Sequence, residues 1–220
     1  MHDRAARLDD APLFLTETMM TEPAPGRARR LKALTEATHQ WLDTTVSGVG
    51  SFATRAAYAR FATMQWLFHR DIDALYTDPA VQAWLPGLAE RRHLPALRQD
   101  LADLDSALPD GAAPLFPAAG TVDPATALGW LYVAEGSRMG AALLRKAAAR
   151  LGLSDTFGAR HLAPAAAGPA AYWRAFTAAL DAVPLDAAGE ARVVAGAEAA
   201  FARVQALADA MLRRAETQIG

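Results

Sequence analysis

Apolar residues recur at helical spacing along most of this chain, and no stretch alternates apolar and polar residues as a half-buried strand does. Between residues 27 and 46, for example, Leu31, Leu34, Thr38 and Leu42 follow one another at intervals of three or four. Side chains at these intervals lie on one face of an α-helix and can pack against neighbouring helices. The pattern therefore predicts an all-α fold, a single-domain helical bundle without strands.

Glycine, proline and capping residues separate the helical segments from one another. Asp123 followed by Pro124 marks one helix start, because aspartate caps a helix N-terminus and proline is tolerated in its first turn. The helices are expected at residues 27–46, 54–75, 78–84, 90–108, 123–151, 170–182 and 186–216.

The composition limits the kinds of protein that this chain can be. Of its 220 residues, 52% are hydrophobic and 21% are charged, which is enough apolar material for one large core. The net charge of −2 argues against a general nucleic-acid surface, so we expect no nucleic acid as a partner. No apolar run approaches the ~18 residues of a membrane-spanning helix, so we expect no membrane span. The chain has no cysteine, which excludes disulfides and thiolate metal sites and suits a cytoplasmic location.

The first residues of the chain differ from the rest. They are rich in charged side chains, lack the apolar stretch of a signal peptide and lead into a linker at residues 23–26. We expect residues 1–24 to form a flexible N-terminal extension and residues 25–220 to form the domain. Met19 and Met20 are alternative starts of translation, and residues before them would then be dispensable.

The helix that begins at Asp123 has three glycines in its interior, Gly129, Gly136 and Gly140. Each costs roughly 1 kcal/mol of helix stability relative to alanine, so they need a reason. At about 100° per residue, successive members of the set differ by only about 20° and 40°, so all three lie on one stripe. Such a bare stripe permits either tight helix–helix packing or the close approach of a flat ligand.

His39 lies in the middle of the first helix and shares a stripe with Thr35 and Leu42, so it faces the core or a cleft. Lys32 lies seven residues earlier, within about 20° of the same face and ~10 Å back along the axis. An imidazole with a cation at that distance suits an iron ligand paired with a propionate clamp, since histidine commonly ligates haem iron. The alternative is an ordinary core histidine with a solvated lysine nearby.

The other histidines carry weaker signals. His69 and His93 adjoin arginines and are expected on solvated faces, His161 is expected in a loop, and His2 lies in the extension.

Several segments together resemble the haem oxygenase family. Residues 129–140, GWLYVAEGSRMG, look like the distal-helix signature of the bacterial branch associated with bacteriophytochromes. Residues 31–42, with their T-x-x-T-H core, resemble the proximal helix of the same family. Further matches occur in family order at residues 157–162, 172–176 and 197–201, so the resemblance extends over about residues 27–216.

The resemblance implies that haem lies between the proximal helix and a distal helix kinked near its glycines. Haem is then both substrate and cofactor, and dioxygen and an external reductant such as ferredoxin or a flavoprotein are required. The implied products are biliverdin, carbon monoxide and ferrous iron. An electron-donor protein and a bacteriophytochrome that accepts biliverdin are the implied protein partners.

The family positions also assign roles to individual residues. His39 is implied as the iron ligand, Lys32 and Arg174 as propionate contacts, and Phe201 as part of the pocket wall. On the oxygen side, Gly136 and Gly140 are implied to bring the helix backbone close to the ring. Ser137 stands where the animal enzymes have an aspartate, so water held by backbone groups is implied as the proton source. These seven assignments are the expected catalytic and binding set.

Two other functions fit the same residues less well. A non-haem di-iron oxidase would use the two E-x-x-H pairs that helical di-iron sites need, completed by two further carboxylates. The candidate ligands of that site are Glu36, His39, Glu90, His93, Glu135 and Glu198. A haem-binding carrier or sensor without catalytic activity would need most of the same haem contacts as an oxygenase.

Overall fold

The computed structural model describes residues 26–48, 50–110 and 113–213. The expected N-terminal extension, residues 1–24, lies outside the described residues. Within these ranges the chain is helical and contains no strand, with only isolated bridges from Ser154 to Phe157 and Gly158. The predicted all-α fold is confirmed. No helix among the described residues is both long and apolar enough to cross a membrane.

The α-helices of the described chain, with the short helical turns between them, follow the predicted order. They are α1 (Arg27–Gly48), α2 (Arg55–Ile72), η1 (Asp73–Thr77), α3 (Pro79–Trp84), η2 (Ala89–Arg91), α4 (Leu94–Asp103), α5 (Pro124–Ser137), η3 (Arg138–Gly140), α6 (Ala141–Ala149), η4 (Arg160–Leu162), α7 (Pro169–Ala182), α8 (Ala187–Ala208) and η5 (Asp209–Arg213).

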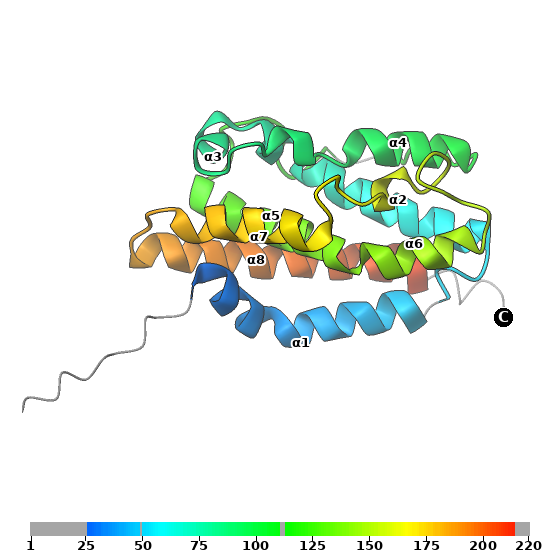
Figure 1. The fold of residues 1–220 in the computed structure, drawn as a ribbon, viewed down its shortest axis with the longest axis horizontal. Coiled ribbons are helices and arrows are strands. Elements are labelled where there is room, and N and C mark those ends of the chain that lie inside the picture. Colours follow the sequence, from blue (N-terminus) through cyan, green and yellow to red (C-terminus); the bar gives the residue numbers. More distant parts are fainter. Residues whose placement is uncertain (1–25, 49, 111–112, 214–220) are drawn as a thin grey trace, which may run out of the picture.

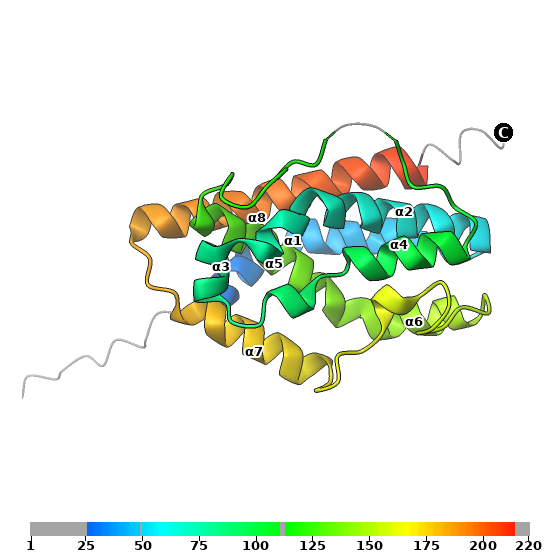
Figure 2. The same cartoon turned by 90° about the horizontal axis from the view of Figure 1, so that it is seen from above.

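The helices form three layers (Figure 1). Helices α2, α3 and α4 lie at the top of that view, α5 to α8 lie in the middle and α1 lies alone at the bottom. Seen from above, α8 runs along one edge of the molecule and α7 and α6 run along the opposite edge (Figure 2). Helix α5 runs between these edges and packs closely along α8.

Capping side chains fix where several helices begin. The carboxylate of Asp123 accepts a hydrogen bond from the Thr126 amide at 2.9 Å, as its position before Pro124 predicts. Two predicted helices differ from expectation at their ends. The one expected at 90–108 is a 3₁₀ turn followed by α4, because Pro95 can occupy only the first turn of a helix. The last one ends as an α-helix at Ala208 and continues as a π-helical turn.

Helix α5 is the centre of the core. It is apolar all round, and nearly all of its side chains from Ala125 to Glu135 are buried. Where it crosses α8, a Cβ atom on Gly129 would lie 2.5 Å from the Ala197 amide nitrogen, and one on Gly196 would overlap the Thr126 carbonyl. The two helix backbones are therefore in direct contact. Of the two interpretations of the glycine stripe, helix packing therefore applies to Gly129.

We predict that Gly129→Ala destabilises the fold, because a methyl group at this crossing must push the two backbones apart. Overpacking of this kind costs about 1–3 kcal/mol, more than the helix propensity that alanine gains. Urea unfolding of the apo-protein measures the change. Gly140→Ala is the matched control, since nothing described lies within 4 Å of a Cβ there. Equal stability of the two variants would contradict the packing role.

Candidate active site

The distal segment is broken where the glycines predict a kink. Helix α5 ends at Ser137, and η3 follows before the chain resumes as α6. The Arg138 amide bonds to the carbonyls of Glu135 and Gly136, and the Ala141 amide bonds to that of Arg138, which tightens the turn. The break thus lies within the predicted family signature.

Gly136 and Gly140 flank this break and do not serve helix packing. A Cβ atom on Gly136 would meet only the Trp173 ring, at an ordinary contact distance of 3.5 Å. Nothing in the described chain lies within 4 Å of a Cβ on Gly140. Packing of two helix backbones therefore accounts for Gly129 but not for Gly136 or Gly140.

Helix α1 is fastened to the domain at its N-terminal end. The guanidinium of Arg27 is buried, donates to the backbone carbonyls of Leu180 and Val183, and pairs with Glu190 at 2.8 Å. Farther along, Leu31 is also buried, so the first turns of α1 pack against α7 and α8. These contacts fix the N-terminal end of α1.

His39 lies three turns farther along α1 and is exposed. Its ring is 6.4 Å from that of Phe201 on α8, edge-on at 73°. Phe201 itself is buried, so it forms a firm apolar surface beneath the imidazole. The structure thus brings together the predicted iron ligand and the predicted pocket-wall residue.

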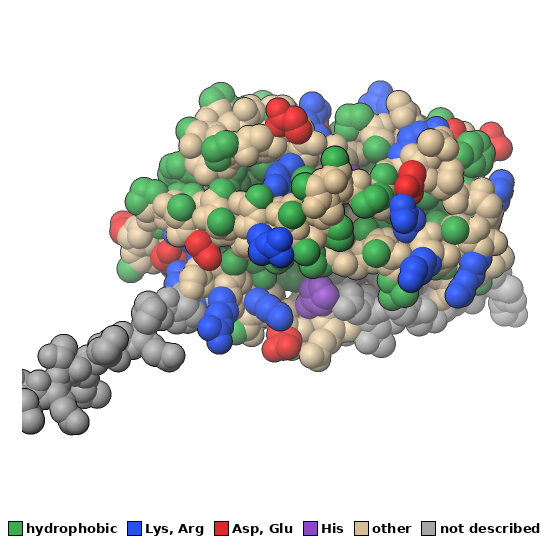
Figure 3. Space-filling view, viewed as in Figure 1, with side chains coloured by type: hydrophobic (Ala, Val, Ile, Leu, Met, Phe, Trp, Pro, Cys, Tyr) green, Lys and Arg blue, Asp and Glu red, His purple; other side chains and the backbone are tan. Residues whose placement is uncertain are grey.

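A hollow separates α1 from the helices above it, and a histidine side chain lies at its edge (Figure 3). Lys and Arg side chains lie on both sides of the hollow, over α1 and over α7. Lys32 on α1 and Arg174 on α7 are both exposed. Large apolar side chains are also exposed on the elements around it, with Leu34 at 60% and Leu143 at 72%. Exposed apolar surface with cations nearby suits a flat apolar ligand that carries carboxylates.

A smaller pocket of about 230 Å³ adjoins the break in the distal segment. Glu135 and Arg138 line it from the α5 side, and Tyr172 and Trp173 line it from α7. Since Trp173 also faces Gly136, this pocket and the glycine break share a wall. Ser137 is exposed, and its hydroxyl donates to the Ala134 carbonyl at 2.7 Å, so its oxygen can still accept a hydrogen bond from water.

The predictions for His69 and His93 are wrong, because neither ring lies on a solvated face. His69 is 6% exposed and His93 is half-buried, with their ring centroids 5.3 Å apart. The His93 Nε2 atom bonds to the Arg138 guanidinium, which also lies 4.7 Å from the Tyr172 ring. Burial lowers the pKa of His69 to about 3, and the positive charge of Arg138 contributes to this. Both rings therefore belong to a buried polar cluster behind the break.

His161 was expected in a loop but is buried in η4. Its Nδ1 atom lies 2.8 Å from the Asp100 carboxylate on α4, which also accepts hydrogen bonds from the His161 and Arg160 amides. Burial alone would raise the pKa of Asp100, but these hydrogen bonds hold it below its ordinary value. His161 Nε2 and His69 Nδ1 are buried and bond to no described residue, so water is the natural partner for each. Sequence reasoning missed this cluster.

The di-iron alternative does not fit the described residues. Among them no three His, Cys, Asp or Glu side chains are grouped so as to hold a metal ion. Two of the ligands that it requires are already engaged by arginines, since His93 contacts Arg138 and Glu135 pairs with Arg91.

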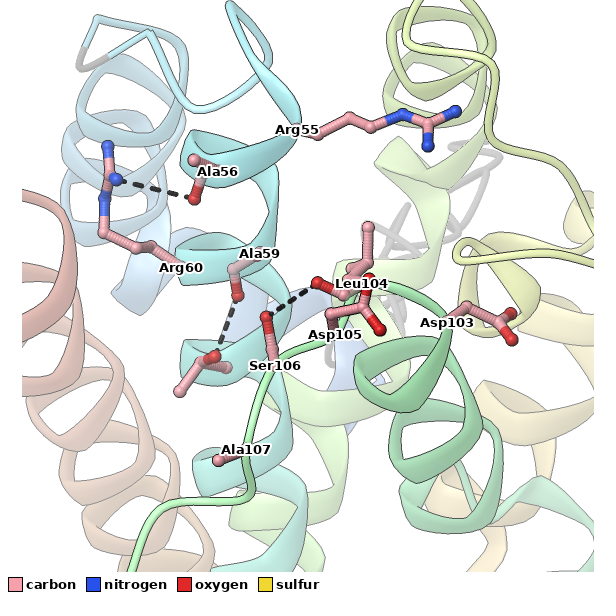
Figure 4. A pocket seen from close by; sticks show the side chains of 10 residues that line it. Arg55, Ala56, Ala59, Arg60, Asp103, Leu104, Asp105, Ser106 and Ala107 are labelled. Atoms are coloured by element: carbon pink, nitrogen blue, oxygen red, sulfur yellow. Dashed lines mark hydrogen bonds between the residues drawn. The ribbon is translucent and has the colours of Figure 1, made fainter.

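A pocket of about 530 Å³ lies elsewhere, between α2 and the segment that follows α4 (Figure 4). None of the predicted site residues lines it. Arg60 points away from the 103–107 segment, and Arg55 donates to the Leu151 carbonyl at 2.8 Å. The two arginines that line this pocket are thus directed elsewhere, and the hollow beside α1 is the better candidate for the active site.

We predict that His69→Gln reduces the dependence of stability on pH between pH 7 and 5. The unfolded chain binds a proton at this histidine below about pH 6.5, whereas the folded chain does so only near pH 3. The parent protein therefore loses stability as the pH falls through this window, by roughly 2 kcal/mol from this residue. Urea unfolding at both pH values measures the difference. An unchanged difference in the variant would contradict the buried, neutral assignment.

Comparisons with known proteins agree with this geometry. The family described as heme oxygenase matches residues 26–210. Heme oxygenase PigA of Pseudomonas aeruginosa is 44% identical over 177 residues, which are 80% of this chain and 88% of that protein. The NO- and CO-bound heme oxygenase of Neisseria meningitidis has a TM-score of 0.79 at 37% identity, covering 86% of this chain and 93% of that one.

A more distant structure has the same fold. Heme oxygenase-1 of the cyanobacterium Synechocystis, solved in complex with heme, has a TM-score of 0.69 at 18% identity and covers 89% of this chain and 96% of that one. The match over nearly the whole described domain, together with close relatives at 44% and 37% identity, establishes the family. This chain is a member of the haem oxygenase family.

Proposed function

We propose that this chain cleaves haem to biliverdin, carbon monoxide and ferrous iron in the hollow between α1 and the distal break. The observation that carries the proposal is the open space at Gly140, on the distal segment that the sequence matches to the family. His39, exposed on α1, would hold the haem iron there. Bound haem supplies the iron that activates dioxygen and the ring that is opened, with electrons from ferredoxin or a flavoprotein.

The residues of α1 and α8 hold the proximal side. His39 would hold the haem iron through one ring nitrogen, and the edge-on Phe201 ring would restrict the rotation of the imidazole. Lys32 lies about two turns earlier on α1, so its ammonium can pair with a propionate at the mouth of the hollow. Arg174 is exposed on α7 and can contact the other propionate from the opposite side.

The distal segment forms the opposite side of the site and holds the water that supplies protons. Without side chains at Gly136 and Gly140, the backbone of the break could lie close to the bound ring. The Ser137 hydroxyl and the carbonyls freed at the break can hold water there. The buried cluster of His69, His93 and Arg138 can keep further water ordered behind it. Proton delivery by such water needs no carboxylate at position 137.

The finer biological assignments rest on the resemblance of residues 129–140 to the branch associated with bacteriophytochromes. We assign a bacteriophytochrome as the acceptor of biliverdin and the cytoplasm as the location. The absence of cysteine supports the second assignment. The assignment of the biliverdin acceptor is tested by mixing an apophytochrome with the working enzyme. The apophytochrome should then gain its chromophore spectrum.

We predict that His39→Ala keeps the helical fold and loses axial histidine ligation, because the ring is exposed and contributes little to the core. Haemin titration followed at the Soret band should show at least tenfold weaker binding, and biliverdin should be nearly absent by chromatography. Added imidazole should restore part of the Soret spectrum. An unchanged Soret maximum would mean that another residue ligates iron. Stable haem in the parent protein with reductant and oxygen would favour the carrier function.

We predict that Gly140→Leu folds normally and binds haemin but forms much less biliverdin. The leucine side chain enters open space, so the free energy of unfolding should change by less than about 1 kcal/mol. The same side chain then occupies the space beside the bound ring where oxygen must lie. Melting temperature, haemin affinity and biliverdin per bound haem are the measurements. A normal biliverdin yield per bound haem would remove Gly140 from the site.

A further inference from the structure

Arg91, in the short turn η2, joins the two helices that border the distal side of the hollow. One nitrogen, Nη1, donates to the Glu135 carboxylate of α5 at 2.7 Å. The other, Nη2, donates to the Tyr172 carbonyl of α7 at 3.2 Å. The guanidinium also stacks on the Tyr172 ring at 3.7 Å. A single planar group thus contacts α5 and α7 in three ways.

The α5 end of this connection is buried. Glu135 is 1% exposed, and its second oxygen accepts a hydrogen bond from the Tyr76 hydroxyl at 3.0 Å. Burial raises the pKa of the Glu135 carboxyl above its ordinary value, and the contacts with Arg91 and Tyr76 oppose that rise. A carboxylate without these partners would be costly at this depth. The geometry of η2, η1 and α5 is therefore held by one satisfied network.

The residues next to both ends belong to the candidate site. Glu135 directly precedes Gly136, where the distal segment begins to break. Tyr172 directly precedes Trp173, whose ring is what a Cβ on Gly136 would meet at 3.5 Å. Arg174, the candidate propionate contact, follows one residue later. Any movement of Arg91 relative to either partner would change the spacing between the break and α7.

We propose that Arg91 is a positioning residue that sets the distance between the distal break and α7, and thereby selects the orientation in which haem is held and the ring carbon that is opened. The inference rests on the proposed function, since it concerns the same site. Arginine suits this task because its planar fork serves two acceptors and a ring face at once. A lysine at position 91 would keep the charge but could not make all three contacts.

The variants separate positioning from simple stability. Arg91→Met and Glu135→Leu each leave one buried polar group without its partner, so both should lower the melting temperature. The double variant Arg91→Met/Glu135→Leu removes both charges and should recover much of it, because apolar pairs can replace buried ion pairs. Arg92→Met is the matched control. Arg92 neighbours Arg91 but pairs with the more exposed Asp73 at 2.9 Å.

Two readouts report on the site. The first is the ¹⁹F resonance of Trp173 in 5-fluorotryptophan-labelled apo-protein, one of five tryptophans and assigned with Trp173→Phe. The second is the ratio of biliverdin isomers, together with the haem methyl NMR pattern of the ferric cyanide complex. We expect the double variant and Arg91→Lys to shift the Trp173 resonance and to raise the minor isomer at least threefold. The control should match the parent in both readouts.

A parental Trp173 resonance and isomer ratio in Arg91→Lys and in the double variant would overturn the proposal. If the double variant does not fold, the Trp173 resonance and isomer ratio of Arg91→Lys alone test the proposal. A shifted Trp173 resonance with an unchanged isomer ratio would also overturn it, because the spacing would then not govern ring opening. Failure of the parent protein to form biliverdin would instead refute the proposed function, while the apo-protein resonance would still report whether Arg91 positions α7.

Discussion

The direct backbone contact between α5 and α8 is the constraint on which the rest of the structure depends. Gly129 and Gly196 allow it, and any larger residue at either position would separate the two helices. Since α5 is buried on all sides, its neighbours α2, α7 and α8 are placed relative to it. The end of α5 is consequently fixed in space, and the chain breaks into η3 where that burial ends. The rigid core helix α5 thus places the irregular, solvent-facing backbone of η3 at the edge of the hollow.

Burying this helix end brings polar groups into the interior, and each of them needs a partner. Glu135 accepts hydrogen bonds from Arg91 and Tyr76. Arg138 bonds to His93 and lies over the Tyr172 ring. These partners come from η1, η2, the start of α4 and α7, so the polar network fastens four separate segments to the distal break. The same network leaves ring nitrogens on His69 and His161 that no described residue satisfies. The distal side therefore combines rigidity with places for ordered water, which suits chemistry that consumes protons.

The sequence predicted the helices because they depend on local periodicity. Spacing alone placed His39 on the face of α1 that carries Thr35 and predicted that it faces the core or a cleft, whereas the structure leaves its side chain exposed. The break near Gly136 followed from the family signature. The histidine cluster could not be predicted, because consecutive residues on a helix differ by about 100° and the charge of Arg70 says little about the burial of His69. Spacing alone also could not separate the two interpretations of the glycine stripe. One stripe extends ~16 Å along the axis and meets α8 at Gly129 but open space at Gly140.

The two sides of the hollow differ in how firmly they are held, and this difference has a consequence for binding. The distal break is fastened by the core and by the Arg91 and Arg138 contacts, whereas α1 is fastened through Arg27 at its first turn. His39 lies about 18 Å beyond that attachment. A haem that is held by His39 and rests against the distal break would join α1 to that break. Part of the binding free energy then stabilises α1 itself, so haem affinity and the order of the proximal helix are linked quantities.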